Sequence, residues 1–222
     1  MNIFTTEHDI EAILFHQVRP HGVLSARMEA ALRSVNRIPF LPPAFADVAY
    51  GDAPIPLKRR CELPFFVLAR LLQSLDIHSI DRACVLSSGA GYSGTLLSRL
   101  CGAVEAYESD SVLFARLIDA TRGNVIITPM SSLSTRSVDV ILMDGGAIDA
   151  VPQHVLDKLL PGGRIAFVRV MRESAPSLEA PLCEGVLLQK DIDGSFLLPQ
   201  TICQLHLPRL ISHTTQKEAF HF

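Results

Sequence analysis

Val85-Leu86-Ser87-Ser88-Gly89-Ala90-Gly91-Tyr92 is the stretch of sequence that decides the fold. The apolar run 83–86 predicts a buried strand, and residues 93–100 after the stretch predict a helix. Small residues between a strand and a helix let the chain turn sharply and let a ligand approach the backbone. The stretch therefore predicts a nucleotide-binding turn at one edge of a sheet.

An acidic residue stands at a matching distance from this turn. Glu108 comes nineteen residues after Gly89 and ends the next predicted strand, 104–107. A carboxylate at that position can accept two hydrogen bonds from ribose hydroxyls, so turn and acid together indicate an adenosine-type nucleotide. Two plainer interpretations stay open: the glycines only make a tight turn, and Glu108 is a solvated carboxylate at a strand end.

Short apolar runs alternate with amphipathic segments over residues 82–170. The predicted strands are 83–86, 104–107, 125–128, 138–143 and 164–170, and the predicted helices are 93–100, 111–121 and 152–160. Such alternation is typical of a doubly wound α/β fold with a mostly parallel sheet. Asp193-Gly194 lies between runs 186–190 and 195–198 and predicts a hairpin, hence an antiparallel edge near the C-terminus.

The first 63 residues predict a helical extension packed on this core. Residues 9–17 and 25–35 have helical spacing of apolar side chains, and prolines after position 37 end the second helix. Residues 50–63 are expected to form a loop, and Pro64 precedes a helix over 65–75. We thus expect an extension, 1–63, and a main domain, 64–222, in one structural unit; 171–183 read as an exposed crossover and 219–222 as a segment apolar enough to dock.

Composition excludes several classes of function. The 222 residues are 48% hydrophobic and 19% charged, as expected for a folded protein. A net charge of −3, with scattered Lys and Arg, argues against nucleic acid as a partner. The acidic N-terminus and the lack of a long apolar run predict a cytoplasmic protein with no membrane partner. The five cysteines have no metal-ligand spacing, so we expect buried thiols and no metal site.

The order of these motifs resembles the protein-L-isoaspartate O-methyltransferases, especially shorter and diverged bacterial relatives. The likeness covers about residues 17–170 and rests on segments 17–20, 28–32, 35–42, 49–52, 64–72, 85–92, 107–108, 124–125, 138–141 and 159–165. The resemblance implies a Rossmann-like class I methyltransferase fold with S-adenosyl-L-methionine as cofactor. It also implies an O-methyltransferase that acts on a carboxylate, of a small molecule or a protein, or on another small nucleophile.

The resemblance also implies roles for particular residues. Gly89 and Gly91 would approach the methionine part of the cofactor, and Glu108 would take its ribose. Asp144, at the end of the fourth predicted strand, would border the methyl transfer site, and Glu62 stands where the family has a serine. The implied cofactor-binding residues are Ser87, Ser88, Gly89, Ala90, Gly91, Tyr92, Glu108 and Met130, and the implied catalytic residues are Glu62 and Asp144.

The sequence also departs from the family, which keeps alternatives open. Val85 stands where the family has an acid and Ser87 where it has its first glycine, and the Asp-Gly expected to meet the adenine is replaced by residues 128–131, where Met130 offers an apolar wall. A degenerate, non-catalytic relative that keeps the fold is one alternative. An NAD-dependent oxidoreductase is another, because residues 89–94 match G-x-G-x-x-G. Arg59-Arg60 is either a holder of an anionic acceptor or an exposed charge cluster without a role.

Overall fold

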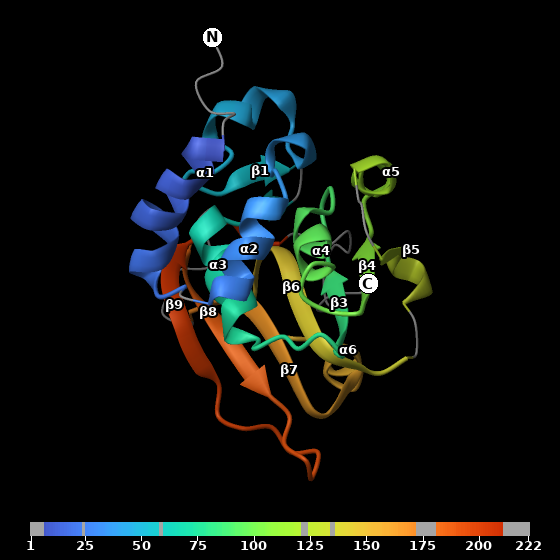
Figure 1. Cartoon of the computed structure of the whole chain (residues 1–222). Helices are drawn as coiled ribbons and strands as arrows, with labels where there is room; N and C mark the ends of the chain where they lie inside the picture. The colour runs from blue at the N-terminus through green and yellow to red at the C-terminus, as the bar shows by residue number, and fades with distance from the viewer. Residues whose placement is uncertain are drawn as a thin grey trace.

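The structure is a computed structural model, and it describes residues 7–23, 25–57, 60–120, 124–133, 136–171 and 181–210. Within these residues a seven-stranded sheet has the order β5-β4-β3-β6-β7-β8-β9 (Figure 1). Its strands are β3 (Arg82–Leu86), β4 (Ala103–Glu108), β5 (Val125–Pro129), β6 (Val138–Ile148), β7 (Leu159–Val170), β8 (Leu182–Gln189) and β9 (Gln200–His206). The five neighbouring strands β5, β4, β3, β6 and β7 are parallel, which confirms the predicted mostly parallel sheet.

The register of the parallel strands sets the position of the site. Leu86, the last residue of β3, lies opposite Tyr107 of β4 and Met143 of β6. The residues that follow these three positions are Ser87, Glu108 and Asp144. Because parallel strands present their carboxyl ends at one edge, the predicted turn and both predicted acids reach the same edge of the sheet.

Helices and short helical turns surround the sheet. The α-helices are α1 (Glu7–Ile13), α2 (Ala26–Ser34), α3 (Phe65–Ser74), α4 (Tyr92–Leu97), α5 (Ser111–Ala120) and α6 (Gln153–Leu156). A π turn covers Leu14–Val18, and 3-10 turns cover Arg19–His21, Ile38–Phe40, Pro43–Val48 and Met130–Ser132. Figure 1 shows α1, α2 and α3 on one face of the sheet, in front of β6 to β9.

Two hydrophobic clusters follow from the alternation of side chains along the strands. The larger cluster joins α2, α3 and α4 to one face, which includes Val85 and Leu142. The smaller cluster lies on the other face and includes Leu86, Met143 and Val155 of α6. Residues of the N-terminal extension, such as Leu32, thus share a core with the sheet.

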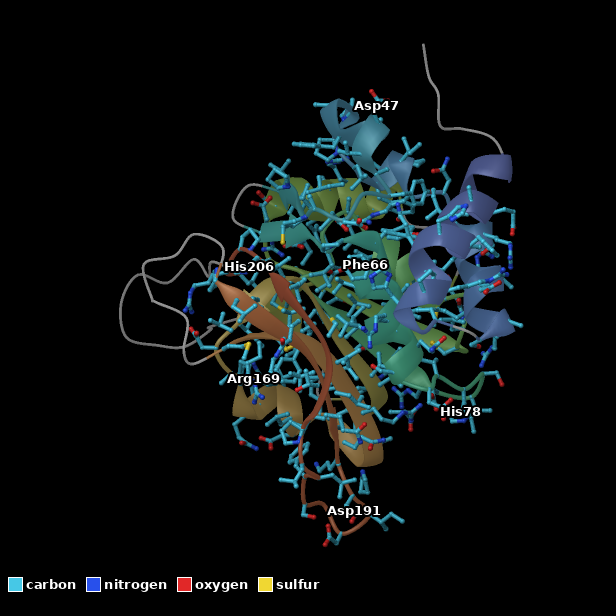
Figure 2. All side chains as sticks on the ribbon, turned by 90° about the vertical axis from the view of Figure 1, so that its left-hand side faces the viewer. Asp47, Phe66, His78, Arg169, Asp191 and His206 are labelled. Atoms are coloured by element: carbon cyan, nitrogen blue, oxygen red, sulfur yellow. The ribbon has the colours of Figure 1, made fainter. Side chains whose placement is uncertain are left out.

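The C-terminal edge of the sheet is antiparallel as predicted, but its strands have other bounds than expected. β8 pairs antiparallel with both β7 and β9. Residues 195–198 were expected to form the second strand of the hairpin, but β9 starts only at Gln200, and one isolated bridge joins Lys190 to Phe196. The connection extends away from the body of the protein, with Asp191 near its tip (Figure 2).

Three further expectations are wrong in detail. Residues 50–63 are not only a loop, because β1 (Ile55–Leu57) and β2 (Arg60–Glu62) pair as a small antiparallel sheet. The helix expected over 152–160 ends at Leu156, since β7 already begins at Leu159. The helix expected over 93–100 ends at Leu97. The expected crossover at 171–183 falls largely, and the apolar end at 219–222 wholly, outside the described residues.

Candidate functional site

The turn after β3 is built by left-handed backbone conformations. Ser87, Gly89 and Gly91 have φ angles of 57°, 58° and 98°. The amide of Ser88 donates to the carbonyl of Tyr107 at 3.0 Å, and the amide of Gly91 donates to the carbonyl of Ser88 at 2.9 Å. Ser87 is notable because a residue with a Cβ atom is strained by about 1 kcal/mol or more in this region. The turn thus keeps the shape of a glycine-rich loop although its first residue is serine.

Glu108 faces this turn from the end of β4. Its Oε2 atom accepts a hydrogen bond from the amide of Gly89 at 2.9 Å, and its Oε1 atom accepts from the amide of Asp110 at 2.8 Å. The side chain is buried, and this burial raises the pKa of Glu108 above its usual range, against the opposing effect of Arg60. The structure therefore brings the predicted loop and the predicted acid into direct contact.

Arg60 of β2 is the cation that neutralises Glu108. Its Nη1 atom lies 2.7 Å from Oε2 of Glu108, and its Nη2 atom donates to the hydroxyl of Ser109 at 3.1 Å. The arginine side chain is 5% exposed and that of Glu108 is 0% exposed. The interpretation of Arg60 as part of an exposed charge cluster is therefore wrong. Arg59 lies outside the described residues.

Glu62, two residues further along β2, covers the turn itself. A Cβ atom placed on Gly89 would meet Oε1 of Glu62 at 2.6 Å, which is closer than any two such atoms can approach. A hydrogen bond from the amide of Ala90 favours the ionised carboxylate of Glu62. The space above Gly89 is thus taken by a carboxylate of the same chain.

Asp144 comes two residues after Leu142 of β6, which lies opposite Val85 and shares its hydrophobic cluster. Its Oδ1 atom accepts a hydrogen bond from the next amide, that of Gly145, at 2.7 Å. Asp144 thus brings a carboxylate near the edge where, by the family resemblance, Val85 has replaced one.

Burial changes the ionisation of the two predicted catalytic acids, and for Glu62 the charge of Asp144 adds to this effect. Burial, followed by the negative charge of Asp144, raises the pKa of Glu62 to about 8. Burial also raises the pKa of Asp144, while hydrogen bonds from Ser93 and the Gly145 amide, and then the charges of Arg37 and Arg60, oppose that rise. A raised pKa near 8 means that Glu62 carries a proton at neutral pH. The pair can therefore hold one proton between two buried carboxylates.

Arg37 completes the cluster, and sequence reasoning gave it no role in the site. It is 1% exposed, its Nη2 atom donates to the carbonyl of Leu63 at 2.6 Å, and it lies 3.9 Å from Oε2 of Glu62. Its guanidinium carbon lies 5.3 Å from the ring centre of Tyr92, which is a cation–π distance. Within the described residues, Nε and Nη1 of Arg37 and the hydroxyl of Tyr92 have no hydrogen-bond partner. The sequence signal that could have indicated Arg37 is its position in the segment 35–42, which is part of the family resemblance.

The predicted site residues meet at one edge of the sheet, and Met130 directly follows Pro129, which lies opposite Glu108. Glu62, the turn 87–92, Glu108 and Asp144 all belong to the buried edge described above. Met130 lies in the 3-10 turn after β5 and packs in the smaller cluster, together with Leu86 and Tyr107. It is 2% exposed and presents no open apolar wall.

An adenosyl group does not fit this edge in the arrangement that the structure describes. Both oxygens of Glu108 already accept hydrogen bonds from the protein, and Glu62 occupies the approach to Gly89. Ser87 to Tyr92 are all buried. The unpaired polar atoms of Arg37, Tyr92 and Ser88 nevertheless mark the edge as a polar site within the protein. The residue types suit a nucleoside, but Arg60 and Glu62 already occupy contacts that it would need.

Other features of the described residues involve none of the predicted site residues. A cavity of about 510 Å³ is lined by residues of β7 and β8 and of the segment after β6, including Asp149, Phe167 and Arg169, and by none of the predicted site residues. In the described part of the chain, no group of three or more His, Cys, Asp or Glu is arranged to hold a metal ion. No helix in the same ranges is long and apolar enough to cross a membrane.

Comparisons with known proteins point in one direction. A family model for "Protein-L-isoaspartate(D-aspartate) O-methyltransferase (PCMT)" matches residues 9–127. A protein-L-isoaspartate O-methyltransferase of Methanoculleus marisnigri is 26% identical over 85% of this chain and 90% of its own length. A protein of the same name from Desulfosudis oleivorans is 30% identical over 73% of this chain and 77% of its own length.

Solved structures agree on the fold. A protein-L-isoaspartate O-methyltransferase superposes with a TM-score of 0.64 at 18% identity, over 86% of this chain and 64% of its own. A Plasmodium falciparum protein, solved in complex with S-adenosyl-L-homocysteine, superposes with a TM-score of 0.67 at 13% identity, over 90% of this chain and 97% of its own. The chain thus has the fold of these proteins.

Proposed function

The chain belongs to the protein-L-isoaspartate(D-aspartate) O-methyltransferase family, and from this premise we propose that it is a methyltransferase with S-adenosyl-L-methionine as its cofactor. The observation that carries the proposal is the contact between the turn and the acid: the Gly89 amide lies 2.9 Å from the Glu108 carboxylate. In a sheet of this order, a glycine turn and an acid at the next strand end form the usual site for a ribose.

A carboxylate is the proposed methyl acceptor, of a protein or of a small molecule. A carboxyl group with a pKa of about 4 is ionised at neutral pH, so it needs no general base to become a nucleophile. Asp144 belongs to β6, at the carboxyl edge of the sheet. We propose that it borders the methyl acceptor. Glu62 replaces the serine that the family resemblance leads one to expect, so isoaspartyl specificity is not part of the proposal.

The cytoplasm is the proposed compartment. The cysteines 61, 84, 101, 183 and 203 are all free thiols, and free thiols are typical of proteins in a reducing environment. Nucleic acid and membrane are not proposed as partners, since the chain carries a net charge of −3.

Calorimetry with two ligands and a buffer control tests this proposal. S-adenosyl-L-homocysteine, NAD and buffer are titrated into the full chain at concentrations up to millimolar. We expect saturable binding of the homocysteine compound alone. A response to NAD instead would favour the oxidoreductase alternative, and binding of neither compound would favour the non-catalytic relative.

A substitution at the acid sharpens the test. Glu108→Ala should weaken the binding of S-adenosyl-L-homocysteine about tenfold or more, because charged hydrogen bonds contribute about 1.5–3 kcal/mol. Glu184→Ala is the matched control, since Glu184 pairs with Arg169 and Thr201 on β7 and β9, away from the turn. An unchanged affinity in Glu108→Ala would show that the ribose does not bind there.

A further inference from the structure

We propose that Arg60 and Glu62 of β2 occupy the cofactor cradle of this protein themselves, and that S-adenosyl-L-methionine binds only to a form in which β2 has moved away from Glu108 and Gly89. This inference rests on the function proposed above and concerns how the same site opens. Figure 1 shows β1, the partner strand of β2, beyond the end of the sheet to which β3 and β4 point.

The first observation is the position of the Arg60 guanidinium. It donates to Oε2 of Glu108 at 2.7 Å and reaches the hydroxyl of Ser109 at 3.1 Å. Ribose hydroxyls would need acceptor sites on the same carboxylate, where Oε2 already accepts from Arg60 and the Gly89 amide and Oε1 from the Asp110 amide. A guanidinium matches a carboxylate better than a hydroxyl does, because its hydrogen bonds are charge-assisted. Arg60 and the ribose therefore compete for Glu108.

The second observation is independent and concerns Glu62. Its Oε1 atom lies where even a methyl group on Gly89 would collide, at 2.6 Å. A ligand that approaches the backbone of the turn would meet this carboxylate first. Both obstructing side chains come from the same three-residue strand, so one displacement removes both.

The third observation is that the obstruction is a stable arrangement. Arg60, Glu62 and Glu108 are each at least nine-tenths buried. Separating a buried ion pair leaves uncompensated charges, so the open form is a minor population unless a ligand replaces the contacts. The apparent dissociation constant then equals the intrinsic one divided by the open fraction. Occlusion by β2 thus raises the apparent dissociation constant, and a comparison of variants can measure this effect.

Affinity measurements give the first test. S-adenosyl-L-homocysteine is titrated into the wild-type chain and into Arg60→Ser, Glu62→Ser and the double variant, with circular dichroism to verify folding. We expect at least tenfold tighter binding in the double variant, with Glu62→Ser intermediate. Arg169→Ala is the matched control, because Arg169 pairs with Glu184 in a part of the sheet away from β2, and it should bind like the wild type.

Cys61 gives a second test that uses the wild-type sequence at the site. Cys61 lies between the two obstructing residues on β2, and its thiol is buried. We expect S-adenosyl-L-homocysteine to accelerate its alkylation by iodoacetamide at least threefold, as mapped by mass spectrometry, whereas ligands ordinarily protect thiols. A Cys203→Ser background removes the partly exposed thiol.

The outcomes separate this inference from the proposed function. Equal affinity in the wild type and the folded variants, or slower labelling of Cys61 with ligand, would overturn the occlusion and leave the cofactor assignment standing. No binding by the wild type or by any folded variant would overturn the cofactor assignment, and this inference with it. Measurable binding by the wild type that becomes at least tenfold tighter in the variants would support both.

Discussion

Nη1 of Arg60 lies 2.7 Å from Oε2 of Glu108, although the two residues are 48 positions apart in the chain. One belongs to the N-terminal segment before the sheet and the other ends β4. The pair therefore fixes β2 against the carboxyl edge of the sheet. Its energetics can be measured without any ligand.

Arg60→Met should destabilise the protein by about 3 kcal/mol or more, because it leaves a buried carboxylate without its cation. Arg60→Met combined with Glu108→Leu should cost much less, since replacing both members of a buried pair by apolar side chains is often neutral. Urea denaturation of the two variants and the wild type measures this difference. Additive losses in the double variant would show that the two charges are not coupled.

Glu62→Gln should flatten the dependence of stability on pH between about 4.5 and about 8. The folded-state pKa of Glu62 is raised from 4.5 to about 8. Across this interval the folded protein keeps a proton that the unfolded chain has lost, so the free energy of unfolding falls as pH rises. Urea midpoints from pH 5 to 8 measure the slope. Asp139→Asn, on the same strand as Asp144, is a comparison variant that keeps Glu62. An identical slope in the wild type, Glu62→Gln and Asp139→Asn would contradict the raised pKa of Glu62.

Gly89→Ala should destabilise the protein by about 2 kcal/mol, and this cost should shrink when Glu62 is replaced by serine. The alanine Cβ would collide with Oε1 of Glu62, and the φ angle of 58° adds strain. Only the collision is removed in Gly89→Ala/Glu62→Ser, so part of the cost should remain. A double-mutant cycle by thermal denaturation gives the coupling. A coupling of zero would place the Glu62 carboxylate away from Gly89.

Ser87→Gly should stabilise the protein by about 0.5–1 kcal/mol. Ser87 has a φ angle of 57°, where glycine carries no steric penalty. Ser88→Gly is the matched control: Ser88 has no positive φ angle, so glycine there should only add flexibility to the unfolded chain and destabilise slightly. Differential scanning calorimetry on the two variants compares them. Stabilisation by Ser88→Gly but not by Ser87→Gly would contradict the described backbone.

The alternation of strands and helices was readable because each parallel strand is a short apolar run. The end of β3 at Leu86 and that of β4 at Glu108 follow from such runs, and they place the turn beside the acid. The small sheet β1–β2 could not be predicted, because each strand has only three residues and the charged run 58–60 is typical of a surface loop. The start of β9 was missed because the turn pair Asp193-Gly194 sits in a longer connection than a tight hairpin.

The candidate site was predictable as a set of residues but not as an arrangement. Sequence reasoning placed Glu62, Glu108 and Asp144 at one site, and the structure brings them to the same buried edge. It gave Arg37 no role, and it offered Arg60 as a holder of an anionic acceptor or as an exposed charge but not as the partner of Glu108. A contact between residues 48 positions apart leaves no local sequence pattern. The roles of these residues and the division of the chain at residue 63 stay predictions.

The small strand β2 also makes the sheet depend on the segment that precedes it. Glu108 and Asp144 lie in an apolar setting beside the guanidinium groups of Arg60 and Arg37, both supplied by the first 63 residues. A fragment starting at Pro64 would keep the acids and lose both cations. Loss of both cations would favour protonation of these two buried carboxyl groups, so the N-terminal segment favours their ionised forms at neutral pH.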